Sequence, residues 1–155
     1  MGNKVVGYAP GVYDLFHVGH LNILKHARQR CDFLIAGVVS DEMCVLAKGR
    51  PPVVPVAERL EIVRHLDVVD DVHLEDVPHK LDTWRVLGFD RIFKGDDWKD
   101  TPRGRRLESD FAAVGVEVVY FPYTVHTSSS VLRRALDTLE RGPRTVGGLD
   151  EVVSG

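Results

Sequence analysis

The sequence predicts an α/β domain with an open parallel sheet and helices on both faces. Three observations support this prediction: the chain has 155 residues, strand-like and helix-like patterns alternate along it, and one strand-like run is apolar almost throughout. A chain of this length normally folds as a single domain around one hydrophobic core. Alternation of strands and helices favours a parallel sheet, because parallel neighbours are joined by crossover helices.

The N-terminal part of the chain has the pattern of a βαβ unit. Residues 5–9 have the character of a buried strand, and a turn through Gly11 and Gly19 leads to helical spacing of apolar residues at 21–27. Residues 33–39, FLIAGVV, form the near-continuous apolar run expected of a strand that is covered on both faces.

The same alternation continues through the rest of the chain. Residues 48–52 are expected to form a loop, because the paired prolines at 51 and 52 exclude a regular hydrogen-bonded ladder. Two more strand–helix alternations follow. The later elements are a helix at 58–66, strands at 91–94 and 116–121, and a closing helix at 131–139 that the serines at 128–130 are expected to cap. The predicted architecture is therefore Rossmann-like.

Composition limits the classes of function. A net charge of -3 argues against general nucleic-acid binding, which requires a dense cationic surface. No apolar run approaches the roughly 20 residues that span a bilayer, and the N-terminus lacks the apolar stretch of a signal peptide. We therefore expect a cytoplasmic protein.

The domain is predicted to occupy residues 1–140, and the Gly-, Pro- and charge-rich segment 141–155 is expected to be a flexible tail or a linker to further sequence.

A candidate phosphate-binding motif follows the first predicted strand. In parallel α/β sheets ligands bind beyond the carboxyl ends of the strands, and residues 11–20, GVYDLFHVGH, lie at that position. His17 and His20 are three residues apart at the start of a helix, so both imidazoles can face one bound group. Gly19 permits close approach of the backbone, and a helix N-terminus favours phosphate.

These residues resemble a known family. The pattern Gly11-x-Tyr13-Asp14-x-x-His17-x-Gly19-His20 resembles the HxGH signature of the cytidylyltransferase-like nucleotidyltransferases. Residues 94–98, KGDDW, are similar to the matching segment of the bacterial glycerol-3-phosphate cytidylyltransferases. The resemblance extends over residues 5–136. It implies transfer of CMP from CTP to a small phosphate- or phosphonate-bearing alcohol, Mg²⁺ bound through the nucleotide phosphates, and a homodimer.

The resemblance also implies roles for individual residues. His17 and His20 are expected to stabilise the transition state, while Lys48 and Arg59 bring positive charge to the triphosphate and the acceptor. Arg59 and His126 are expected to contact the acceptor. The residues expected to contact the nucleotide are Gly11, Val12, Tyr13, Asp14, Gly19, Lys94, Asp96, Asp97, Trp98, Thr127, Ser128, Ser129 and Arg133.

One segment departs from the family pattern and leaves alternatives open. The glycerol-3-phosphate enzymes have an Arg-Thr-x-Gly-Ile-Ser-Thr-Thr segment where this chain has YTVHTSSS at 123–130, so another phosphorylated alcohol or a phosphonate competes as acceptor. The Ser-Ser-Ser-x-x-Arg pattern is also similar to adenylyl-transferring relatives, which keeps ATP open as donor. Two other functions compete: a nucleotide-binding sensor without turnover, and a metal-dependent hydrolase that uses Asp14, His17 and His20.

Overall fold

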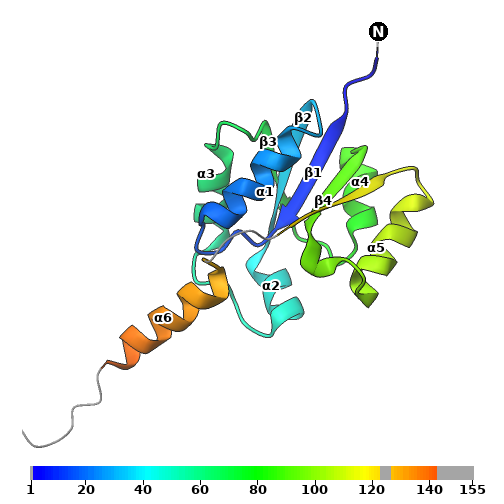
Figure 1. Ribbon diagram of the computed structural model, residues 1–155. Helices are drawn as coiled ribbons and strands as arrows, with labels where there is room; N and C mark the ends of the chain where they lie inside the picture. Colours follow the sequence, from blue (N-terminus) through cyan, green and yellow to red (C-terminus); the bar gives the residue numbers. More distant parts are fainter. Residues whose placement is uncertain (1, 123–126, 143–155) are drawn as a thin grey trace, which may run out of the picture.

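The central element of the fold is a five-stranded sheet in which all neighbouring strands are parallel (Figure 1). The computed structural model describes residues 2–122 and 127–142. The strands are β1 (Val6–Gly11), β2 (Phe33–Val39), β3 (Asp71–Glu75), β4 (Arg91–Gly95) and β5 (Glu117–Phe121). Their order across the sheet is β3-β2-β1-β4-β5, so the chain crosses from one side of β1 to the other between β3 and β4. The carboxyl ends of β1 and β4 therefore flank the switch point at which such sheets bind ligands.

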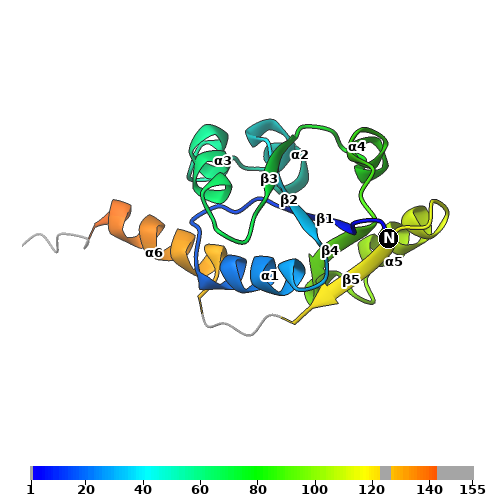
Figure 2. The same ribbon diagram turned by 90° about the horizontal axis from the view of Figure 1, so that it is seen from above.

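Helices cover both faces of the sheet, which confirms the predicted fold class (Figures 1 and 2). The helices are α1 (Val18–Arg28), α2 (Asp41–Lys48), α3 (Val56–Arg64), α4 (Lys80–Leu87), the short 3₁₀ helix η1 (Asp96–Trp98), α5 (Pro102–Ala112) and α6 (Ser129–Arg141). One core cluster packs α1 and α3 on the sheet through Leu24 and Val63. The second packs α4 and α5 on the opposite face through Trp84, Leu107 and Phe111.

Helix α6 projects away from the rest of the domain, and none of its residues is buried (Figure 2). Its N-terminal end lies beside the start of α1, where the Oγ of Ser129 donates a 2.7 Å hydrogen bond to the carbonyl of Asp14. The predicted cap is confirmed, because the Oγ of Ser128 accepts the N–H of Val131 at 3.2 Å. The proposed tail extends beyond the described residues. No helix in the described ranges is long and apolar enough to cross a bilayer.

Helix α2 was not predicted, although its ends have clear signals. Ser40 caps it by accepting the N–H of Met43, and Gly49 ends it with a φ of 75°. Cys44 is its one buried residue, so the helix has no periodic apolar face. Lys48 consequently lies at the last position of a helix, whereas the sequence pattern placed it in a loop.

Candidate active site

The turn between β1 and α1 has a strained backbone. Tyr13 and Leu15 have φ values of 55° and 49°, a region that costs a residue with a side chain about 1–3 kcal/mol. Gly11 precedes them, and a Cβ there would lie 3.1 Å from the ring of Tyr13. The Tyr13 ring is buried and its hydroxyl donates to the carbonyl of Ala9 at 2.7 Å. Tyr13 is thus a structural support of the turn, and its phenol is directed into the domain.

His17 and His20 cap the N-terminus of α1 reciprocally. Nδ1 of His17 accepts the N–H of Gly19 at 3.0 Å, and Nδ1 of His20 accepts the N–H of His17 at 3.3 Å. An imidazole nitrogen that accepts a hydrogen bond carries no proton, so the proton of each neutral ring is on Nε2. Both histidines therefore present an N–H donor beyond the helix end, and their ring centroids are 4.0 Å apart.

The surroundings keep both rings neutral. His20 packs against the rings of Tyr13 and Phe16, with centroids 5.5 and 5.2 Å away. Burial, followed by the proximity of His17, lowers the pKa of His20 to about 3. Burial also lowers the pKa of His17. The pair offers neutral hydrogen-bond donors at pH 7.

Asp14 organises the site through its carboxylate. The carboxylate accepts the N–H groups of Val53 and Val54 at 2.8 and 2.9 Å and a 2.8 Å ion pair from Arg133 of α6. Asp14 is 3% exposed. The carboxylate oxygens are bound by the protein itself, and the contact of Asp14 with the nucleotide stays a prediction. Arg133 is held in the same network.

Arg59 is also structural, which corrects its predicted role. The residue is 1% exposed. Its Nε donates to the carbonyl of Val54 at 2.8 Å, and its Nη2 forms a 2.7 Å ion pair with Asp41. Its Nη1 donates to the carbonyls of Val12 and Val39 at 2.6 and 2.8 Å. A guanidinium enclosed in this way fixes the ends of β1 and β2, and an acceptor phosphate cannot reach it. Val12 therefore contributes its carbonyl to the scaffold.

Lys48 remains a candidate contact for the triphosphate. It is exposed at the end of α2, and its charge is close enough to contribute to the lowered pKa of His20. Ser129 is nearby, with its Oγ 3.5 Å from Nε2 of His20. Thr127 and Ser128 are half-buried just before α6, whereas His126 is outside the described residues.

A second group of predicted residues follows β4. Asp96 and Asp97 are exposed on η1, and Trp98 is half-buried between two cations: the Nζ of Lys94 is 4.0 Å and the guanidinium carbon of Arg103 4.5 Å from the centroid of its ring. Burial, with the charge of Lys80 as a smaller cause, lowers the pKa of Lys94 to about 7. Strands β1 and β4 are neighbours, so these residues face the same crevice end as the histidines.

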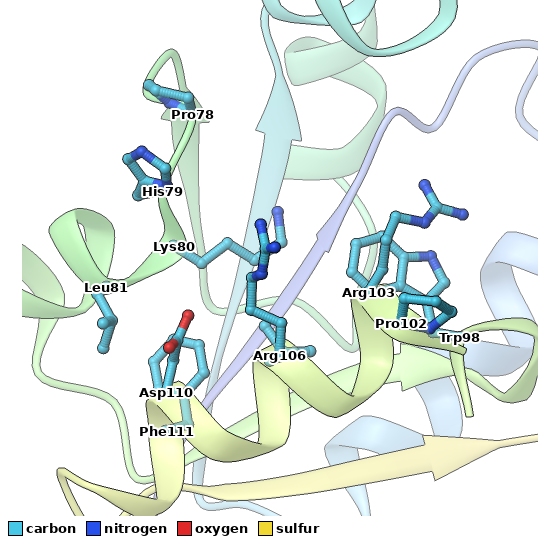
Figure 3. A pocket seen from close by; sticks show the side chains of 11 residues that line it. Pro78, His79, Lys80, Leu81, Trp98, Pro102, Arg103, Arg106, Asp110 and Phe111 are labelled. Atoms are coloured by element: carbon cyan, nitrogen blue, oxygen red, sulfur yellow. The ribbon is translucent and has the colours of Figure 1, made fainter. Parts of the chain in front are cut away.

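A cavity of about 410 Å³ lies between α4 and α5, beside Trp98 (Figure 3). Lys80, Arg103 and Arg106 line it together with the carboxylate of Asp110 and apolar residues that include Phe111. These cations were not predicted. The signal for Arg103 and Arg106 was the basic segment 103–106, RGRR, which follows the KGDDW motif and its loop, whereas Lys80 had none. Within the described ranges, no group of three or more His, Cys, Asp and Glu residues is arranged to hold a metal ion, and Asp14, His17 and His20 form no such group.

The chain is similar to known proteins in both sequence and fold. The cytidylyltransferase-like family model matches residues 8–135. The chain is 37% identical over 114 residues to an FAD synthase of Pyrococcus abyssi, covering 73% of this chain and 77% of the relative. It is 31% identical over 137 residues to a glycerol-3-phosphate cytidylyltransferase of Bacillus spizizenii, covering 88% and 98%. A solved lipopolysaccharide core biosynthesis protein of Thermoplasma volcanium superposes with a TM-score of 0.68 at 26% identity, covering 81% of this chain and all of that one. The chain therefore belongs to the cytidylyltransferase-like family of nucleotidyltransferases.

Proposed function

We propose that the chain transfers CMP from CTP to the phosphate or phosphonate group of a small alcohol and releases pyrophosphate. The observation that carries this proposal is the pair of neutral histidines whose Nε2–H groups project from the N-terminus of α1. Preorganised donors at a helix N-terminus suit the charge that develops on a phosphoryl group during transfer.

The reaction requires alignment more than acid–base chemistry. An oxygen of the acceptor phosphate, already anionic, forms a bond to the α-phosphorus of CTP while the bond from that phosphorus to the bridging oxygen of pyrophosphate breaks. The Nε2–H donors of His17 and His20 stabilise charge on the α-phosphate oxygens. Lys48 is placed to meet the departing pyrophosphate. Mg²⁺ bound through the nucleotide phosphates would neutralise part of their charge, which fits a chain whose described residues offer no metal-ligand cluster of their own.

The choice of CTP rests on the residues after β4. Asp96 and Asp97 offer exposed carboxylates that suit the hydroxyl groups of a ribose, and the half-buried Trp98 follows them on the same 3₁₀ helix. This segment is the one that resembles the glycerol-3-phosphate cytidylyltransferases. Gly11, Gly19 and the N-terminus of α6 at Thr127, Ser128 and Ser129 complete the proposed nucleotide site, with Arg133 acting through Asp14.

ATP with a phosphorylated flavin is a second candidate pair. The similarity to FAD synthases supports it, since FAD consists of AMP joined to flavin mononucleotide (FMN). The two donor–acceptor pairs are distinguished by incubating the protein with CTP or ATP, Mg²⁺ and either sn-glycerol 3-phosphate or FMN. Mass spectrometry of the product then identifies both donor and acceptor. A CDP- or ADP-linked product with release of pyrophosphate supports nucleotidyl transfer. Bound nucleotide without pyrophosphate release would indicate a sensor, and CMP formed without acceptor would indicate a hydrolase.

The homodimer stays a prediction, for which sedimentation of the intact chain is the test.

A further inference from the structure

Three cations, Lys80, Arg103 and Arg106, line the cavity between α4 and α5. We propose that Lys80, Arg103 and Arg106 bind the acceptor's phosphate there, and that the acceptor has an uncharged or anionic body larger than glycerol. This role replaces the one predicted for the buried Arg59. The catalytic part of the inference rests on the proposed function, whereas the binding part does not.

The position of the cavity suits the acceptor. In-line displacement places the attacking oxygen and the departing pyrophosphate on opposite sides of the α-phosphorus, so one cationic cluster cannot hold both. The histidines and Lys48 belong to the turn after β1 and to the end of α2. The cavity belongs to α4, α5 and η1, with α4 and α5 packed on the opposite face of the sheet from α1. The neutral histidine pair at the start of α1 and the cations of α4 and α5 therefore lie on elements that pack against opposite faces of the sheet.

The guanidinium groups of the cavity lack carboxylate partners. Within residues 2–122 and 127–142, arginines such as Arg28, Arg59 and Arg85 have a carboxylate oxygen within 4.0 Å, but Arg103 and Arg106 do not. Both nevertheless line one concave surface of a chain whose net charge is -3 (Figure 3). Guanidinium groups that line a cavity and have no carboxylate partner are suited to bind phosphate through paired hydrogen bonds.

Lys80 forms an ion pair with a buried carboxylate. Glu75 is 2% exposed and receives a 3.0 Å ion pair from the Nζ of Lys80 and a 2.8 Å hydrogen bond from the hydroxyl of Tyr8. This network fixes Lys80 at the first position of α4. A side chain held in this way loses little further rotamer entropy when it binds a ligand.

Arg103 is fixed by the contact between α5 and η1. Its guanidinium stacks on the ring of Trp98. A Cβ at Gly104 would lie 2.0 Å from the carbonyl oxygen of Trp98, so only glycine allows α5 to approach η1 this closely. The stacked arginine is therefore part of the fold of this segment, and it extends the proposed base site toward the cavity.

The apolar lining and the size of the cavity define the acceptor's body. Leu81, Leu107 and Phe111 contribute apolar surface to a volume of about 410 Å³. Pockets of roughly 300–1,000 Å³ hold ligands of drug size, so a three-carbon alcohol would leave much of this one unfilled. Lys80 is paired with Glu75 and Asp110 also lines the cavity, but Arg103 and Arg106 leave the lining with a net positive charge that disfavours a cationic amine on the acceptor. Phosphoethanolamine is consequently a poor ligand, and a phosphate ester with an aromatic body is a good one.

Phenyl phosphate is the probe that tests the cavity without requiring turnover. Isothermal titration should show that Arg103→Ala and Arg106→Ala each weaken its binding roughly 10- to 100-fold, since hydrogen bonds to charged groups contribute about 1.5–3 kcal/mol. In Arg106→Ala, which does not contact Trp98 of the proposed base site, the Kd of CTP should change less than about twofold. Arg105→Ala is the matched control, because Arg105 is on the same helix, is exposed and does not line the cavity. Amide shifts of the wild-type protein on addition of phenyl phosphate should lie at residues 79–81 and 103–111.

Three results would overturn the inference: unchanged binding of phenyl phosphate to both variants, weakened binding of CTP in place of phenyl phosphate, or tighter binding of phosphoethanolamine than of phenyl phosphate. A failure of the proposed function is distinguishable from all three. It would appear as absence of pyrophosphate release with every donor and acceptor, while the binding of phenyl phosphate to the cavity remained measurable.

Discussion

Asp14 and Arg133 are separated by 119 positions in the sequence and form an ion pair of 2.8 Å. Through this pair α6 is joined to the turn after β1, and the same carboxylate also fixes the loop at residues 53 and 54. The turn, the loop and the helix meet at one buried anion. We infer that the placement of the histidines depends on this contact, because the turn that holds Asp14 also leads into the cap of α1.

Replacing Arg133 should therefore weaken both the fold and the site. Arg133→Ala removes one of the partners of a buried carboxylate, and we expect the free energy of unfolding to fall by about 1–3 kcal/mol. Turnover should fall as well, because α6 loses its attachment to the turn. Urea unfolding and initial rates measure the two effects. Arg134→Ala, at an exposed position next to it, is the control and should change stability by less than about 0.5 kcal/mol.

Arg59→Ala should act on stability before it acts on acceptor binding. The substitution leaves Asp41 without its ion pair and three backbone carbonyls without their donor. Asp41 is 36% exposed, so the main cost is the loss of hydrogen bonds to the three carbonyls, and we expect the free energy of unfolding to fall by about 1–3 kcal/mol. Thermal and urea unfolding are the measurements, with Arg64→Ala, an exposed residue of the same helix, as the control. A stable variant with only a raised acceptor KM would contradict this placement.

The fold class, and the helix start that carries the candidate site, could be predicted from sequence because both depend on local patterns. The apolar run at 33–39 is β2, and the histidines at 17 and 20 cap the helix that follows β1. The role of Arg59 could not be predicted in this way, because its four partners, Val12, Val39, Asp41 and Val54, come from separate segments that only the folded chain assembles. An arginine on a helix has the same sequence signature whether it faces a ligand or an aspartate of its own chain.

Residues beyond Arg141 are predicted to be dispensable for turnover. The segment is rich in glycine and charge and offers little apolar area to offset its ordering entropy. A chain truncated after Arg141 keeps the whole of α6 and with it the contacts of Ser129 and Arg133 with Asp14. We expect its kcat and KM to match those of the full chain. A folded but inactive truncation would show that the tail takes part in the site.

Substitutions should separate the role of the two histidines in capping α1 from their role as donors to the phosphoryl group. In His20→Asn the side-chain oxygen can still accept the N–H of His17 in place of Nδ1, but the Nε2–H donor is lost. We expect kcat to fall roughly 100- to 1,000-fold, the usual cost of losing one preorganised donor, while the melting temperature changes little. His17→Ala should lower both, because it removes the cap of α1 along with the donor. Near-native turnover in His20→Asn would exclude its role as a donor to the phosphoryl group.

The pKa of His20 also makes the stability of the fold depend on pH. In the folded state burial lowers this pKa to about 3, whereas an imidazole in the unfolded chain titrates near 6.5. Below about pH 6.5 the unfolded chain therefore binds a proton that the folded chain does not, and the free energy of unfolding falls as the pH drops from there toward 3. The slope for one such group approaches about 1.4 kcal/mol per pH unit, so roughly 2 kcal/mol should be lost between pH 6.5 and pH 5. The lowered pKa of His17 adds a contribution of the same sign.

Urea unfolding of the wild type and of His20→Asn across this range measures the effect as a difference of slopes, which cancels the titration of groups shared by both proteins. The variant should lose less stability than the wild type on acidification. Parallel curves would mean that His20 has the same proton affinity in the folded and unfolded chain, and hence that its ring is not desolvated between Tyr13 and Phe16.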